Sequence, residues 1–179
     1  IYDVLYKSYT SAHEHNVSIS GGTDRLNYFV SGNYLSQDGT LNWKLDGYKR
    51  INLFGKFEAH PWENVTIGFS SRIIKTDYHQ PRHLTDERYA AMGKECWPIG
   101  PLYDPNGHLF NDTVLRIKEG GQTTNVAKQI TNQLDFVYKP LPGWRIVANA
   151  NYRIGANANT EITLPVYQMS VDGVTPSPD

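Results

Sequence analysis

Strand-like runs of about eleven residues recur along this chain, and short and long connections alternate between them. The short connections are the turns Thr23–Arg25, Pro61–Asn64 and Pro140–Gly143. The long ones are Gln37–Lys49, Asp77–Ala127 and everything after Gly155. Up-and-down barrels of the outer membrane have short turns on one side and long loops on the other. The pattern therefore predicts an all-β chain of antiparallel up-and-down strands that forms part of a transmembrane β-barrel.

The expected strands alternate between apolar and polar side chains with a period of two. They lie near residues 15–21, 26–36, 50–60, 65–76, 129–139 and 144–154, with a long extracellular loop at 77–127. One face carries apolar residues such as Leu53, Phe69 and Leu134, and the other carries polar residues such as Arg50 and Asp135. Within the loop, the composition of Leu84–Lys94 predicts a short helix with Thr85 as its N-cap.

The length of these runs favours a membrane sheet over a soluble one. A tilted strand needs about 9–11 residues to cross a bilayer, whereas strands of soluble proteins average about 5–6 residues. A dry core would not tolerate the charged residues of the polar face, but a water-filled lumen would hydrate them. A soluble antiparallel sheet with one wet face shows the same alternation, so that alternative stays open.

Composition excludes several other classes of protein. The mean hydropathy is -0.52, and no run approaches the roughly 18 apolar residues of a transmembrane helix. A formal net charge of -1 with no basic patch gives no case for nucleic-acid binding. Cys96 is the only cysteine, which excludes an internal disulfide and a cysteine-based zinc cluster.

Six strands are too few to close a membrane barrel on their own, because the smallest such barrels have about eight. The chain starts at Ile1 without a signal-peptide pattern and ends in a loop-like Pro-Ser-Pro-Asp179. We therefore expect a part of a larger barrel with two unpaired sheet edges, which predicts aggregation or dependence on detergent in isolation.

A series of motifs follows in order along the chain: His15-Asn-Val-Ser-Ile-Ser-Gly-Gly22, Asn27-Tyr-Phe-Val-Ser-Gly-Asn-Tyr34, Gln37-Asp-Gly39, Tyr48-Lys-Arg-Ile-Asn-Leu53, Trp97-Pro-Ile-Gly-Pro-Leu-Tyr-Asp-Pro-Asn-Gly107, Asn132-Gln-Leu-Asp-Phe136 and Pro142-Gly-Trp144. Through these motifs, the sequence between about His13 and Tyr152 resembles the SusC/RagA family of TonB-dependent outer-membrane transporters of Gram-negative bacteria.

This resemblance implies a barrel of about 22 strands, of which the chain would supply about six. It also implies a plug domain and a TonB-contacting segment, neither of which is found in this sequence. A SusD-like surface lipoprotein would deliver an oligosaccharide or peptide, and TonB would pass on the energy for import. The expected location is the cell outer membrane, in contact with its lipid.

Four residues are candidates for contact with a substrate. Trp97 and Tyr103 in the long loop can stack on sugar rings or peptide side chains, but such aromatics also pack a long loop together. Arg50 and Arg72 on the polar face can guide a substrate, but such residues also pair with acidic neighbours or with the plug.

The sequence predicts no enzyme, cofactor or metal. It contains no nucleophile elbow, phosphate-binding loop or His-Glu-x-x-His motif. His13 and His15 share one strand face, but no further ligands complete a site. Two other hypotheses remain beside the importer: a soluble β-sandwich that binds glycans through loop aromatics, and a secreted β-rich hydrolase with undetected carboxylates.

Overall fold

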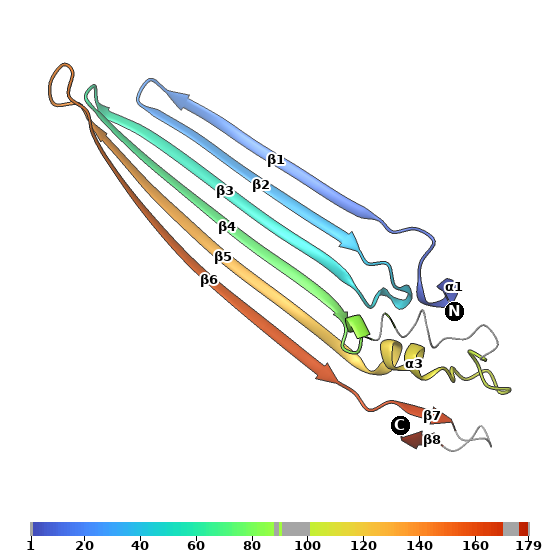
Figure 1. The fold of residues 1–179 in the computed structure, drawn as a ribbon. Coiled ribbons are helices and arrows are strands. Elements are labelled where there is room, and N and C mark those ends of the chain that lie inside the picture. The colour runs from blue at the N-terminus through green and yellow to red at the C-terminus, as the bar shows by residue number, and fades with distance from the viewer. Residues whose placement is uncertain (1, 88–89, 91–100, 170–175, 179) are drawn as a thin grey trace.

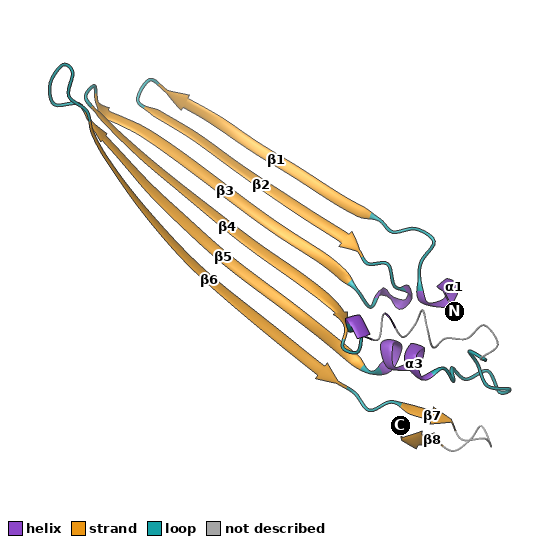
Figure 2. Cartoon of the chain, viewed as in Figure 1, coloured by secondary structure: helices purple, strands orange, loops and turns teal. Residues whose placement is uncertain are grey.

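The computed structural model describes residues 2–87, 90, 101–169 and 176–178. Six long strands dominate it, and short helices and a small second sheet lie at one end (Figures 1 and 2). The elements are α1 (Tyr2–Leu5), β1 (Ala12–Thr23), β2 (Leu26–Asp38), the 3-10 helix η1 (Asn42–Lys44), β3 (Gly47–Trp62), β4 (Val65–Pro81), α3 (Asp112–Glu119), β5 (Gly121–Tyr138), β6 (Ile146–Thr163), β7 (Tyr167–Met169) and β8 (Pro176–Pro178).

The long strands form one antiparallel sheet in the order β1-β2-β3-β4-β5-β6, so every strand pairs with its neighbour in sequence. Figure 1 shows the three short turns at one end of the sheet, here called the turn end. The longer connections, α1, α3 and both termini lie at the opposite end, here called the loop end. The prediction of an antiparallel up-and-down sheet is confirmed, but the sheet is open and its outer strands β1 and β6 do not meet.

The register places the two expected faces on opposite sides of the sheet. The apolar face aligns Leu53 with Ile73, and Ile73 with Ile130. The polar face aligns Phe54 with Arg72, and Arg72 with Thr131. Because directly opposite residues of an antiparallel pair point to the same side, each face is continuous across the sheet.

The strands extend further toward the loop end than the sequence predicts. β4 continues to Pro81 rather than 76, β5 starts at Gly121 rather than 129, and β6 continues to Thr163 rather than 154. The connection between β4 and β5 is correspondingly shorter than the expected loop 77–127. In β4 the extra segment carries Asp77 and His79 on the face that is apolar elsewhere, and in β5 Thr123 and Thr124 place a polar side chain on each face, so both segments lack the apolar-polar contrast on which the prediction depends.

The sheet is a single layer with very little buried core. The chain exposes 12498 Å², whereas a compact monomer of 20.3 kDa is expected to expose about 8,800 Å². Apolar-face side chains such as Leu53, Leu134 and Ile154 are each 48–49% exposed. Among the described elements, the only other sheet is the pair β7-β8, whose strands have three residues each.

The fully buried apolar side chains gather at the loop end. Leu5, Leu41, Val114 and Ile117 form one cluster, here called the loop-end core, and each is at most 1% exposed. It joins α1, the β2–β3 connection and α3, three segments that are distant in sequence. The Asn42 amide reinforces it by donating to the Val4 carbonyl at 2.6 Å.

The long connection contains a helix that the sequence does not predict, and of the predicted helix the described residues 86, 87 and 90 are helical. The structure shows α3 at Asp112–Glu119, where the Asn111 side chain accepts from the Val114 amide and so caps the helix. Most of the predicted helix Leu84–Lys94 lies outside the described residues. Within the described part of the chain, no helix is long and apolar enough to cross a bilayer.

Candidate functional site

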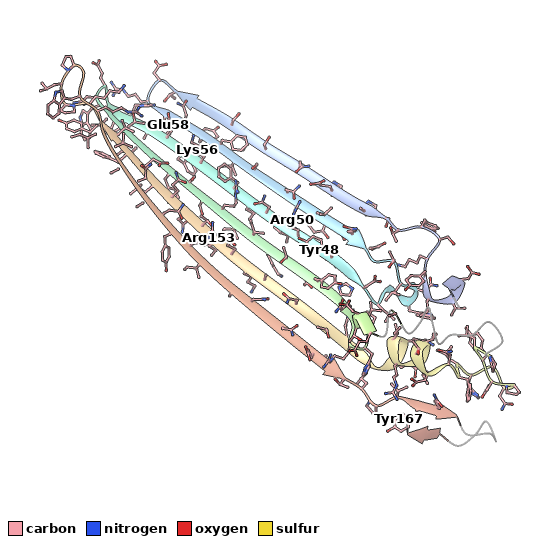
Figure 3. The ribbon with its side chains drawn as sticks, in the orientation of Figure 1. Tyr48, Arg50, Lys56, Glu58, Arg153 and Tyr167 are labelled. Carbon is pink, nitrogen blue, oxygen red and sulfur yellow. The ribbon has the colours of Figure 1, made fainter. Side chains whose placement is uncertain are left out.

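A cluster of polar side chains, here called the Arg50 cluster, lies on the polar face of β1, β2 and β3 near the loop end (Figure 3). The Asn33 amide donates to Glu14 Oε1 at 2.7 Å and to Asn16 Oδ1 at 2.5 Å. The Arg50 guanidinium lies 3.9 Å from the same Glu14 oxygen. These contacts tie three strands together, and Asn52 lies opposite Asn33 in the register.

The cluster surrounds a hollow of about 380 Å³, lined by residues including Ser18, Ser31 and Arg50. Three occluded atoms here have no hydrogen-bond partner among the described residues: Asn33 Oδ1, Asn52 Oδ1 and Arg50 Nε. Because an unpaired polar atom is costly away from water, the cluster suits an occupant with hydrogen-bonding groups of both kinds. Hydroxyl-rich molecules, peptide groups and water all have that chemistry.

Arg72 lies on the same face but closer to the turn end. Its guanidinium carbon is 5.2 Å from the centre of the Phe54 ring, a cation–π distance. Arg153 of β6 shares its level, because Thr131 pairs with both Arg72 and Arg153. The structure thus brings Arg50 and Arg72 onto one face, as predicted, but at different levels of it.

The structure describes only one of the two candidate residues in the long loop. Tyr103 pairs with Leu109 across a tight turn in the β4–β5 connection and is 49% exposed. It is therefore on a different element from the two arginines. Trp97 lies outside the described residues.

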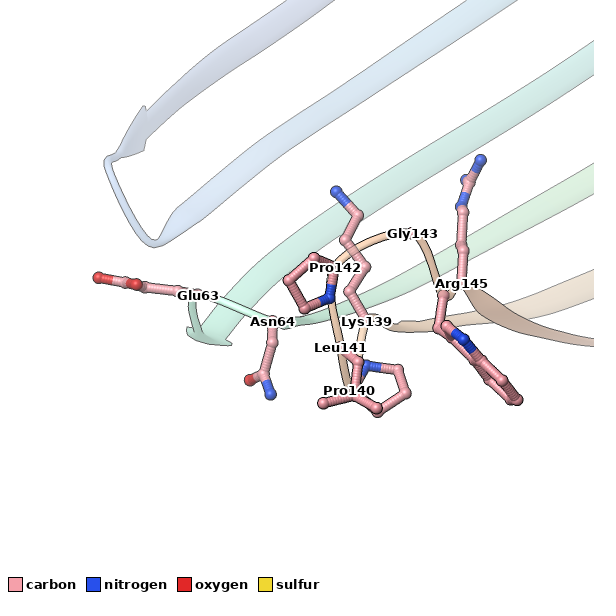
Figure 4. Close-up of a pocket in the computed structure, with 9 residues that line it drawn as sticks. Glu63, Asn64, Lys139, Pro140, Leu141, Pro142, Gly143 and Arg145 are labelled. Carbon is pink, nitrogen blue, oxygen red and sulfur yellow. The ribbon is translucent and has the colours of Figure 1, made fainter.

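A second hollow, of about 590 Å³, lies at the turn end between the β3–β4 and β5–β6 turns. Figure 4 shows Lys139 and Arg145 pointing the same way, while Pro140 and Leu141 lie on the other side of the turn. Its lining comes mainly from residues 139–145 of a single turn. The Arg50 cluster, by contrast, combines three strands with several unpaired polar atoms, so it is the stronger candidate site.

Among the described residues, no group of three His, Cys, Asp or Glu side chains lies close enough together to hold a metal ion. His15 instead stacks on Tyr34, with ring centres 6.5 Å apart. His60 lies 3.3 Å from Glu58, which also lies 3.9 Å from Lys56. The expectation that the chain is not an enzyme stays a prediction.

The turn at residues 104–108 should be sensitive to acid. Burial raises the pKa of Asp104, but hydrogen bonds from His108 and from the Asn106 amide outweigh it and leave the pKa below its ordinary value of 3.8. Because the pKa of Asp104 is lowered in the folded state, the ionised carboxylate stabilises the turn at pH values above its ordinary pKa. This stabilisation is lost as the pH falls through the folded-state pKa. We expect the His108 amide resonance to shift over that acidic range, and Asp104→Asn to abolish the titration. An unchanged titration in the variant would contradict the assignment.

The sequence predicted Arg50 but not the other members of its cluster, Glu14, Asn16 and Asn33. These residues can be placed together only when the register of the first hairpin is known. A two-residue turn at Asp24 and Arg25 pairs Thr23 with Leu26, and counting back from there places Asn16 opposite Asn33.

No protein-family model matches the chain, and no curated protein matches it.

Proposed function

We propose that this chain forms wall and loops of a SusC-like, TonB-dependent importer in the outer membrane of a Gram-negative bacterium. Six strands would supply part of a closed barrel of about 22 strands. The complete transporter would take up an oligosaccharide or peptide with a SusD-like lipoprotein. The single observation that carries the proposal is the wide, exposed apolar face of a one-layer sheet whose opposite face is polar and charged.

The height of the apolar face supports a lipid environment. Along β4 it extends from Val65 at the turn end to Lys75, the first charged residue of this face on that strand. Ten residues of strand span about 34 Å, and the tilt of a membrane barrel reduces this to a height of about 25 Å, the height of a barrel's apolar band. Two polar residues, Ser71 and Asn132, interrupt the band and lie directly opposite each other.

The polar face supports a hydrated lumen. Asp135 accepts from Gln133 and Asn149, and Arg50 approaches Glu14, so its charged groups are partly paired across and along the strands. Water in a lumen would satisfy the remaining atoms of the Arg50 cluster when no substrate or plug residue is bound.

A soluble β-sandwich has less support. It needs a second sheet packed about 10 Å above the apolar face. Among the described residues only β7 and β8 form another sheet, and their three-residue strands are too short to cover strands of 12–18 residues.

Cell fractionation and the flanking coding DNA test this proposal. We expect the protein in the outer-membrane fraction, resistant to salt and alkaline carbonate but extracted by detergent. We also expect a plug-like domain and further alternating strands encoded beside this segment, with a lipoprotein gene next to it. A monodisperse protein in plain buffer, with a start codon just before Ile1 and a stop codon just after Asp179, would contradict it.

A further inference from the structure

Three lysines lie on the apolar face where the apolar band ends at the loop end. Lys75 on β4 is directly opposite Lys128 on β5. Lys49 on β3 is opposite Asp77, two residues beyond Lys75. All three lysines are exposed, and none forms an ion pair with any residue that the structure describes.

The charges of Lys75 and Lys128 repel each other in the chain alone. Directly opposite side chains of an antiparallel pair start about 4.5–5.5 Å apart, and like charges there repel. Elsewhere the chain places cations near carboxylates, as in Arg50–Glu14 and Arg82–Glu161. The nearest carboxylate in the register on this face is Asp77, which faces Lys49 instead. An anion from outside the chain would remove the repulsion.

The position of Lys75 and Lys128 indicates which kind of anion would bind them. The band between Val65 and Lys75 has the height of a bilayer's apolar region, so the lysines lie where hydrocarbon gives way to headgroups. On the same side of the sheet, the next residues toward the turn end are Ile73 and Ile130, which would contact acyl chains. A ligand at this level therefore has an apolar part beside an anionic part.

We propose that Lys75 and Lys128, supported by Lys49, bind the phosphorylated headgroup of a membrane lipid. A phosphomonoester carries about 1.5–2 negative charges at neutral pH and has three strong acceptor oxygens, enough to receive both ammonium groups. The inference rests on the proposed function, because it requires the apolar face to contact lipid. It adds a specific lipid site on the outer wall, separate from the Arg50 cluster inside.

Spin-labelled lipids test the site in the full-length protein reconstituted in phosphatidylcholine bilayers. Electron paramagnetic resonance compares how strongly labelled phosphatidic acid and labelled phosphatidylcholine associate with the protein. We expect a preference for phosphatidic acid of roughly 5-fold per lysine, or about 30-fold for the pair. Lys75→Gln/Lys128→Gln should remove this preference.

The matched control Lys56→Gln/Lys139→Gln changes the charge equally on the polar face and at the turn end. It should keep the preference for phosphatidic acid. An equal loss in the control, or no loss in Lys75→Gln/Lys128→Gln, would overturn the site. Displacement by an equal concentration of inorganic phosphate would assign the lysines to free phosphate and overturn the lipid assignment.

The same spectra separate this inference from the proposed function. Immobilised phosphatidylcholine without any preference for phosphatidic acid would overturn the lipid site alone. No immobilised lipid of either kind would overturn the membrane proposal together with the site.

Discussion

Replacing Leu134 with arginine is expected to lower the free energy of unfolding from the membrane by about 2–4 kcal/mol. Leu134 lies near the middle of the apolar band, opposite Phe69 on one side and Ala150 on the other, and is 48% exposed. In the proposed lipid-facing wall, a guanidinium at that depth would leave water without a partner, which is costly in hydrocarbon. Denaturant titration of the protein folded in bilayers measures the change.

Gln133→Arg is the matched control, because the neighbouring residue of β5 points to the polar face. Its amide donates to Asp135, and an arginine can replace that donor. We expect a change within about 0.5 kcal/mol, as for an exposed polar site. Equal destabilisation by both variants would mean that both faces are in similar surroundings, which contradicts a lipid-facing wall.

The second large effect is expected in the loop-end core. Ile117→Ala should destabilise the packing of α3 against the β2–β3 connection by about 2–5 kcal/mol, because Ile117 is completely buried beside Leu5 and Leu41. Hydrogen exchange should accelerate in α3 and in residues 40–46, while amides in the middle of the sheet keep their protection.

Leu141→Ala removes a similar side chain that is 63% exposed at the turn end. It should leave exchange in α3 unchanged. If Ile117→Ala left α3 protected, or accelerated exchange along the whole sheet, the loop-end core would not be the separate packing unit described above.

The sheet was largely predictable because its pattern is local. In runs such as 65–76, the period of two identifies both the strand and its faces, and short turns force consecutive strands to pair. The strand ends were less predictable. Thr123 and Thr124 place a polar side chain on each face of β5, so only the pairing with the neighbouring strand shows that the strand includes them.

Contacts between residues that are far apart along the chain were not predicted. Leu5, Leu41 and Ile117 come from three short segments, and nothing local indicates that they pack together. The site was predictable in part: Arg50 and Arg72 share the polar face as expected, whereas the bonds from Asn33 to Glu14 and Asn16 depend on the register of the first hairpin. Tyr103 is on a different element, because its turn belongs to the β4–β5 connection.

The most direct test of the central claim is the environment of single spin labels along β5. Cys96→Ala removes the native thiol, and single cysteines are then placed at Ile130, Thr131, Gln133 and Leu134 for labelling in bilayers. We expect labels at Ile130 and Leu134 to collide with oxygen dissolved in the hydrocarbon, and labels at Thr131 and Gln133 to collide with a water-soluble nickel complex. Equal access of the nickel complex to all four positions would contradict a lipid-facing apolar side of the sheet.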